Sequence, residues 1–145
     1  MSKKSSSSAA RRSLTIRSKV TLNRILEITN NSVKIEINDK GTITGRYTGT
    51  QLATINNTTN QDGTSSWSGK FMQMTNKGDT IVATGSGTGE PANSKCIAKI
   101  RGEGEMWTQS TRLANLNGAK WRCEGESNIK KGSTVIYVDI NEMEH

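Results

Sequence analysis

The amino-acid sequence predicts a single all-β domain, an eight-stranded antiparallel barrel that follows a flexible, basic N-terminal arm. A chain of 145 residues fits one domain. Short segments of alternating apolar and polar residues recur along it, with turn residues at intervals of roughly 8 to 12 residues. The chain also contains 14 glycines, many of them inside these segments. Strands that bend sharply to close a small barrel use glycine in this way.

The N-terminal arm is assigned to residues 1–28 and the barrel domain to residues 29–145. Residues 1–26 carry seven basic side chains and no acidic one, whereas the rest of the chain carries equal numbers of both. The excess that gives the formal charge of +7 therefore lies in the arm. The apolar residues of segment 14–28 fit neither the helical nor the strand period cleanly, so a short helix and a first strand both stay open.

Three interpretations of the arm stay open. It is a disordered solubilising tail, or a weak, non-specific contact for nucleic acid or anionic lipid through residues 1–26. Alternatively, it is an organellar transit peptide, because it is rich in Arg and Ser and lacks acids. The expected location is cytoplasmic, with an organelle as the alternative. No apolar stretch suits a secretory signal or is long enough for a transmembrane segment.

The first half of the barrel domain is expected to form strands separated by polar turns. Residues 33–37 alternate between apolar and charged side chains, as a half-buried strand does. The sequence Asn-Asp-Lys-Gly at 38–41 predicts a turn. Residues 42–55 then run as β structure, and the polar stretch 56–64 predicts a loop.

The second half continues the same pattern. Strands are expected at residues 66–74, 80–89, 96–107, 119–127 and 134–140. Pro91 ends the strand 80–89, because proline cannot donate a ladder hydrogen bond. Residues 108–118 predict a loop or a single helical turn. The alternation of strands with short connections is typical of an all-β barrel or sandwich, and the glycines favour the barrel.

Gly85, Gly87 and Gly89 do not form a phosphate-binding loop. A P-loop needs a lysine and a hydroxyl residue after its last glycine, but Glu90 and Pro91 follow Gly89. A dinucleotide-binding motif opens a helix, and no helix is expected here. These glycines are therefore interpreted as strand residues.

Two strands carry charged stripes of matching pattern. The stripes consist of Arg101, Glu103 and Glu105 on one strand, and of Arg122, Glu124 and Glu126 on the other. Their spacing of two residues puts each stripe on one face of its strand. We expect this face to be the outer, solvated one. The alternative is a pair of carboxylates that performs acid–base chemistry in a cavity, with Glu103, Glu105 and Gln73 as the candidate catalytic residues.

The opposite faces carry apolar and small residues, which we expect to line the barrel interior. The candidate ligand-binding residues are Ile100, Met106, Trp121 and Cys123. A largely apolar interior favours a small hydrophobic ligand. No cofactor and no metal are expected, because the two cysteines form no C-x-x-C motif and the single histidine is the terminal His145.

The glycine-rich strands resemble those of a known superfamily. The stretch 71–90 and the strand with Ile100, Gly102 and Gly104 are similar to segments of the allene oxide cyclase-like β-barrel superfamily, especially its uncharacterised bacterial members. The resemblance covers residues 30–140 and implies an eight-stranded calycin-like barrel, often oligomeric, with an apolar cavity. The plant cyclases act on an unsaturated fatty-acid epoxide. No catalytic residue of theirs is carried over to this sequence.

The leading hypothesis is a non-enzymatic or unassigned barrel that binds a small hydrophobic ligand in its interior. One alternative is an isomerase or cyclase that acts on an apolar, reactive substrate. Another is an assembly module whose basic arm binds nucleic acid or an anionic membrane. The expected partners are a small hydrophobic ligand and further copies of the chain in a homo-oligomer.

Overall fold

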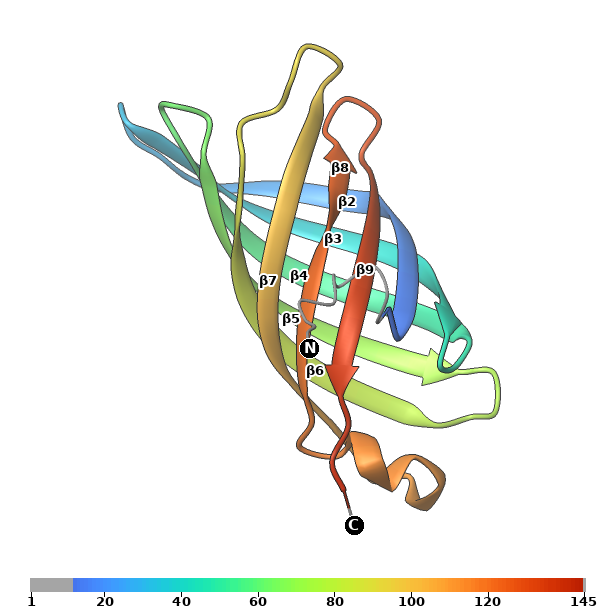
Figure 1. Ribbon diagram of the computed structural model, residues 1–145. Helices are drawn as coiled ribbons and strands as arrows, with labels where there is room; N and C mark the ends of the chain where they lie inside the picture. The colour runs from blue at the N-terminus through green and yellow to red at the C-terminus, as the bar shows by residue number, and fades with distance from the viewer. Residues whose placement is uncertain (1–11, 145) are drawn as a thin grey trace, which may run out of the picture.

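The computed structural model describes residues 12–144 and confirms the predicted eight-stranded antiparallel barrel. Each strand pairs with its neighbours in the sequence, and the last strand pairs with the first (Figure 1). The strands are β2 (Leu14–Ile28), β3 (Ser32–Gly45), β4 (Gly49–Asn60), β5 (Ser65–Thr75), β6 (Thr80–Gly89), β7 (Ile97–Thr108), β8 (Lys120–Asn128) and β9 (Ser133–Asn141). The part of the expected arm before residue 12 and the terminal His145 lie outside the described residues.

The barrel begins before the expected domain boundary at residue 28, because segment 14–28 is its first strand. This strand, β2, pairs with β3 over its whole length and with β9 from Leu14 to Lys19. Beyond Lys19 it pairs with β3 alone, and the β2–β3 hairpin extends past the barrel wall (Figure 1). Two shifts of register interrupt the pairing in this second half. These irregularities explain why the sequence of the segment shows no clean strand period.

Strand β3 continues through residues 38–41, so the turn predicted there is wrong. All four residues pair with β2 on one side and with β4 on the other. The chain reverses instead after Gly45, whose φ of 123° favours glycine. Gly41 serves a close approach of strands, since a Cβ on it would lie 2.6 Å from the carbonyl oxygen of Arg17. Strands β5 to β9 agree with their predicted ranges to within about two residues.

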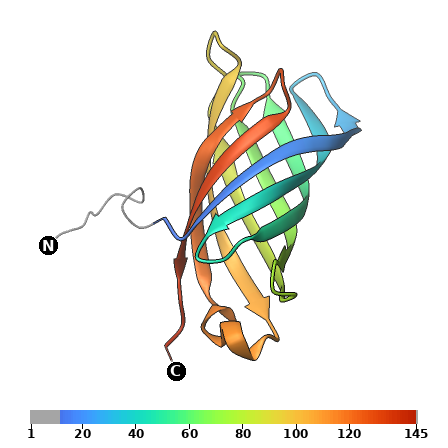
Figure 2. The same cartoon turned by 90° about the vertical axis from the view of Figure 1, so that its right-hand side faces the viewer.

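One end of the barrel is filled and capped. The core lies at this end and is formed by buried side chains from the strands, among them Leu14, Ile43, Ile81, Met106 and Ile140. The 3₁₀ segment η2 (Thr111–Leu116) follows β7 and places Leu113 and Leu116 against the core with 1% and 0% of their surfaces exposed. It lies at the same end of the barrel as the end of strand β9 (Figure 2).

The opposite end is formed by the turns of four hairpins. These are the connections β2–β3, β4–β5, β6–β7 and β8–β9. No described helix covers this end, because η2 follows the other end of β7. The barrel is therefore a cup with a packed floor and an open rim.

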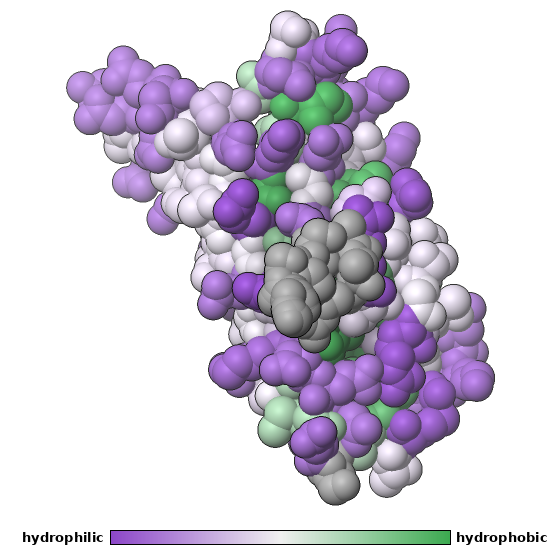
Figure 3. Space-filling model, in the orientation of Figure 1, coloured by the Kyte–Doolittle hydropathy of each residue, from purple (hydrophilic) through white to green (hydrophobic). Residues whose placement is uncertain are grey.

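The charged stripes of β7 and β8 lie on the outer wall, as predicted. Arg101 pairs in register with Glu124, and Glu103 with Arg122. All four side chains are exposed. The face of the molecule seen in Figure 3 is mostly polar, with small apolar areas between polar side chains. Within residues 12–144, no helix is long and apolar enough to cross a membrane.

Candidate functional site

The barrel encloses a cavity of about 280 Å³ between the packed floor and the open rim. Its wall is mainly apolar and includes Ile37, Ala53, Phe71, Ala98, Ile136 and Val138. Residues of the hairpin turns also line it, among them Gly63, Glu90 and Ile129. The cavity therefore extends from the middle of the barrel to the rim.

A chain of buried hydrogen bonds crosses the floor of the cavity. The hydroxyl of Tyr47 donates to Oε1 of Gln73, and Nε2 of Gln73 donates to Oε1 of Gln51 at 2.8 Å. Both glutamines line the cavity and are buried. Burial raises the pKa of Tyr47 well above its ordinary value, so the phenol stays protonated and donates. These two hydrogen bonds fix the orientation of the side-chain amides of Gln73 and Gln51.

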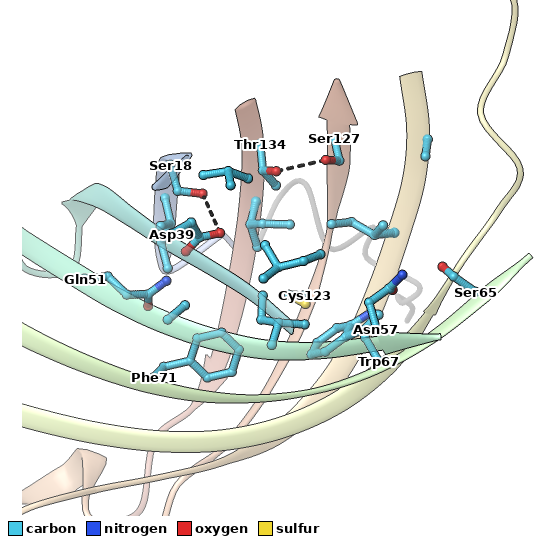
Figure 4. A pocket seen from close by; sticks show the side chains of 18 of the residues that line it. Ser18, Asp39, Gln51, Asn57, Ser65, Trp67, Phe71, Cys123, Ser127 and Thr134 are labelled. Carbon is cyan, nitrogen blue, oxygen red and sulfur yellow. Dashed lines mark hydrogen bonds between the residues drawn. The ribbon is translucent and has the colours of Figure 1, made fainter. Parts of the chain in front are cut away.

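Asp39 is an acidic side chain in this apolar wall. It projects inward from β3, and its Oδ2 accepts a hydrogen bond of 3.4 Å from Ser18 Oγ on β2 (Figure 4). Its other oxygen, Oδ1, is buried, and no donor among the described residues reaches it. Burial raises the pKa of Asp39 from 3.8 to about 6 and outweighs the hydrogen bond from Ser18, which lowers this pKa. The carboxyl group can therefore change its charge near neutral pH.

Aromatic rings form a second part of the wall. The rings of Phe71 and Trp121 meet edge to face, with their centroids 5.9 Å apart. The indole nitrogen of Trp121 donates to the carbonyl of Glu105 at 3.1 Å. Nε1 of Trp67 is buried without an acceptor among the described residues. Asp39 and Trp67 thus leave two buried polar atoms unpaired around one apolar cavity.

The two cysteines are free thiols. Cys123 lines the cavity from β8, opposite Gly102 of β7. Cys96 precedes β7 and lies six residues before Gly102, the register partner of Cys123. At about 3.3 Å per strand residue, Cys96 and Cys123 are therefore too far apart for a disulfide. Burial raises the pKa of Cys123 to about 12, so its thiol is uncharged at neutral pH.

The structure brings together all four residues that the sequence suggested for ligand binding. Ile100, Met106, Trp121 and Cys123 lie on the cavity wall. Their contact with a ligand stays a prediction.

The three candidate catalytic residues are separated by the barrel wall. Gln73 lies at the cavity floor, whereas Glu103 is exposed on the outer face. Glu105 also lies outside, with its carboxylate 3.6 Å from Lys120 Nζ. The geometry therefore offers these two glutamates no access to a molecule inside the barrel.

Sequence reasoning missed Asp39, the most chemically distinctive residue of the cavity. The predicted turn at 38–41 removed it from the strand. A signal was nevertheless present, because Ile35, Ile37, Asp39, Gly41 and Ile43 share one phase of an uninterrupted alternation. Extending the strand period through the turn residues would have placed Asp39 on the apolar face.

Asp39 and Glu90 are the charged side chains of the cavity, both acidic. The described residues that line it include no lysine, arginine or histidine. No group of three or more His, Cys, Asp or Glu side chains within residues 12–144 is arranged to hold a metal ion. The electrostatic character of the cavity is thus set by Asp39 inside and Glu90 near the rim.

Comparison with known proteins finds similar folds only among solved structures. No family model matches the sequence, and no curated protein matches it. A conserved protein of unknown function from Rhodopseudomonas palustris has a TM-score of 0.73 at 14% identity, over 90% of this chain and 95% of that one. A protein of unknown function from Clostridium acetobutylicum has a TM-score of 0.75 at 12% identity, with the same coverage of 90% and 95%.

A third similar structure is an enzyme from Penicillium herquei, with a TM-score of 0.61 at 20% identity over 87% of this chain and 90% of that one. These likenesses concern the fold, since all three identities are low. The chain shares its barrel with uncharacterised bacterial proteins and with one fungal enzyme.

Proposed function

We propose that the protein binds a small, mainly apolar ligand inside its barrel. The observation that carries this proposal is the cavity of about 280 Å³, which the side chains of the wall leave unfilled. Small-molecule sites are usually preformed apolar hollows with a few placed polar groups. Asp39, Gln51 and Trp67 supply such groups here.

The expected ligand is compact, because the cavity lies at the small end of the usual range for ligand sites, which begins at roughly 300 Å³. The ligand enters through the rim, since η2 and the buried core close the other end. Its apolar part lies against Phe71 and Trp121, and its polar groups face the few polar side chains of the wall.

Binding can be tested with N-phenyl-1-naphthylamine, whose fluorescence rises in apolar surroundings. The variant Ala53→Phe fills the cavity, since Ala53 lines it and is 5% exposed. The matched control is Leu52→Phe, because Leu52 directly precedes Ala53 on the strand and is 50% exposed on the outer wall. We expect the wild type and Leu52→Phe to bind the probe and Ala53→Phe to lose binding at least tenfold.

A second variant, Ile100→Trp, fills the cavity from a different strand. It keeps the test valid if Ala53→Phe fails to fold. Circular dichroism identifies variants that keep the barrel. The proposal is overturned if the wild type does not bind the probe, or if both folded, filled variants bind it as the wild type does.

An isomerase or cyclase is the second candidate function. The observation that favours it is Asp39, an acid–base group in an apolar cavity with a pKa near 6. The similar barrel of a fungal enzyme supports the idea that this fold can carry catalysis. Glu103 and Glu105 do not contribute to it, because both lie on the outer wall.

Proton transfer by Asp39 can be detected without knowing the natural substrate. Its carboxylate would remove a proton from the carbon beside a ligand carbonyl and return a proton to the same carbon. In D₂O, a small apolar ketone would then gain deuterium in the presence of the wild type and not of Asp39→Asn. Equal deuterium uptake with both proteins would eliminate this function for Asp39.

A further inference from the structure

The cavity contains a carboxylate without a counterion. Asp39 lines it with one oxygen unpaired and the other held by a single long bond from Ser18. Burying an ionised carboxylate without a partner costs free energy, and an opposite charge nearby recovers that cost. The protein supplies no such charge, since no described lysine, arginine or histidine lines the cavity.

We propose that the ligand of this cavity is an apolar amine whose protonated nitrogen pairs with Asp39. This inference rests on the proposed ligand-binding function and names the chemical class of the ligand. An ammonium group beside Asp39 supplies the missing positive charge and donates hydrogen bonds to the carboxylate.

The rest of the cavity suits the apolar part of such a molecule. Hydrocarbon side chains from β3, β4 and β9 line the same cavity as Asp39, among them Ile37, Ala53 and Ile136. The faces of aromatic rings also attract cations, and Trp67, Phe71 and Trp121 supply three rings to the wall. The cavity therefore offers one charged contact within an apolar and aromatic lining.

The same charge distribution disfavours a ligand carboxylate. A carboxylate inside the cavity would meet Asp39, and one near the rim would meet Glu90. Lys19 and Lys40 are the register pair next to Val20 and Asp39, and both lysines are exposed on the outer wall. Selection for a cation and against an anion thus follows from the sign of the groups that face inward.

Within residues 12–144, the strands around Asp39 present no second charged group to it. Ser18 and Val20 project inward from β2, and Gln51 and Ala53 project inward from β4. Beyond them, β9 contributes Thr134 and Ile136, and β8 contributes Cys123 and Ser127. The Cys123 thiol is neutral, because burial raises its pKa to about 12. Glu90 lies near the rim, beyond the end of β6.

Three probes that share a naphthalene ring and differ in their polar group test the inference. They are 2-(1-naphthyl)ethylamine, 2-(1-naphthyl)ethanol and 3-(1-naphthyl)propanoate. Isothermal titration calorimetry at pH 7.5 gives their affinities for the full chain. We expect the amine to bind about tenfold or more tightly than the alcohol, and the propanoate to bind most weakly.

The variant Asp39→Asn should remove the advantage of the amine and leave the affinity for the alcohol within about twofold. The control Glu126→Gln removes a carboxylate from the outer wall and should leave all three affinities unchanged. Glu90→Gln tests whether the rim alone attracts the amine, and it should reduce the advantage only slightly. A major loss with Glu90→Gln and none with Asp39→Asn overturns the assignment to Asp39.

The wild type provides a second test that needs no variant. The amine keeps its charge between pH 5 and 7.5, whereas Asp39 is ionised above its pKa of about 6 and protonated below it. The affinity for the amine should therefore fall as the pH is lowered to 5, while that for the alcohol stays constant.

The outcomes separate the two proposals. If the amine and the alcohol bind equally to the wild type at pH 7.5, the inference fails and the ligand-binding function stands. If neither these probes nor N-phenyl-1-naphthylamine binds, the ligand-binding function fails, and the inference fails with it.

Discussion

The ring of Trp67 on β5 lies over the inner face of β6 and against Gly102 of β7. A Cβ on Gly102 would be 2.4 Å from Cζ2 of the indole and 2.7 Å from the carbonyl oxygen of Ser86. Gly85 has the same relationship to Trp121, at 2.4 Å. The glycines of β6 and β7 therefore make room for two large rings that are part of the cavity wall.

Replacing Gly102 with alanine should destabilise the barrel. The methyl group must displace both the indole ring and backbone of β6, and such overpacking costs about 1–3 kcal/mol. Urea denaturation measures the change in the free energy of unfolding. The control Ser86→Ala changes an exposed position of β6 and should stay within about 0.5 kcal/mol. Equal stabilities of Gly102→Ala and the wild type would show that the ring does not occupy this slot.

Asp39→Asn should stabilise the unliganded protein at neutral pH. The pKa of Asp39 is about 6 in the folded state against 3.8 for the free side chain, so the folded state holds the proton more tightly. The resulting penalty is absent below the lower value, grows as the pH rises toward 6, and is complete above it, at about 3 kcal/mol.

The difference in unfolding free energy between Asp39→Asn and the wild type should thus be large at pH 7.5 and small at pH 4. Denaturation curves at both values measure it. Glu126→Gln, on the outer wall, serves as the control. A difference that grows as the pH falls would contradict the buried, unpaired state of Asp39.

Asp79→Ala should loosen the capped end of the barrel. The carboxylate of Asp79 accepts hydrogen bonds from Ser110 at 2.6 Å, from Thr75 at 2.7 Å and from the guanidinium of Arg112. These bonds tie the start of η2 to the β5–β6 turn and lower the pKa of Asp79. Loss of the tie should speed hydrogen exchange at the amide of Asn117, which donates within the cap.

Asp62→Ala is the matched control for that measurement. Asp62 accepts the amide of Thr64 in the β4–β5 turn at the opposite end of the barrel. Exchange in the cap should be unchanged in this variant. Unchanged exchange in Asp79→Ala as well would show that core packing alone holds the cap.

Cys123 should react slowly with iodoacetamide in the folded protein. Alkylation requires the thiolate, and burial raises the pKa of this thiol to about 12. At pH 8 we expect the rate for Cys123 to be at least tenfold lower in buffer than in 8 M urea (a denaturing concentration). Mass spectrometry of the Cys96→Ser variant isolates this site. Similar rates in both solvents would mean that the cavity wall opens readily.

The basic arm can now be tested without damaging the barrel. The expected contact with nucleic acid or anionic lipid covered residues 1–26, but Leu14–Ile28 forms strand β2. A deletion of residues 1–11 removes Lys3, Lys4 and Arg11 and leaves the strand intact. If the arm is the contact, this deletion should abolish binding to anionic vesicles at 50 mM salt, and unchanged binding would refute it.

Much of the fold could be read from the alternation of residues within strands. The period of two is local, so it located β5 to β9 and put Glu103 and Arg122 on the outer face. It failed where a local signal conflicted with the strand. The turn-like sequence at 38–41 interrupted β3, and the register shifts of β2 obscured its period.

The sequence by itself therefore determined the strand-rich architecture, the neutral body and the apolar inner faces that include Ile100 and Met106. Only the tertiary structure decided that Asp39 faces an apolar cavity with Ser18 as its donor, and that Trp67 lies against Gly102. Both contacts join residues far apart in the chain, and closure of the barrel sets their distances. The physical reason is that burial and pairing depend on what surrounds a side chain in space, which a local pattern along one strand does not specify.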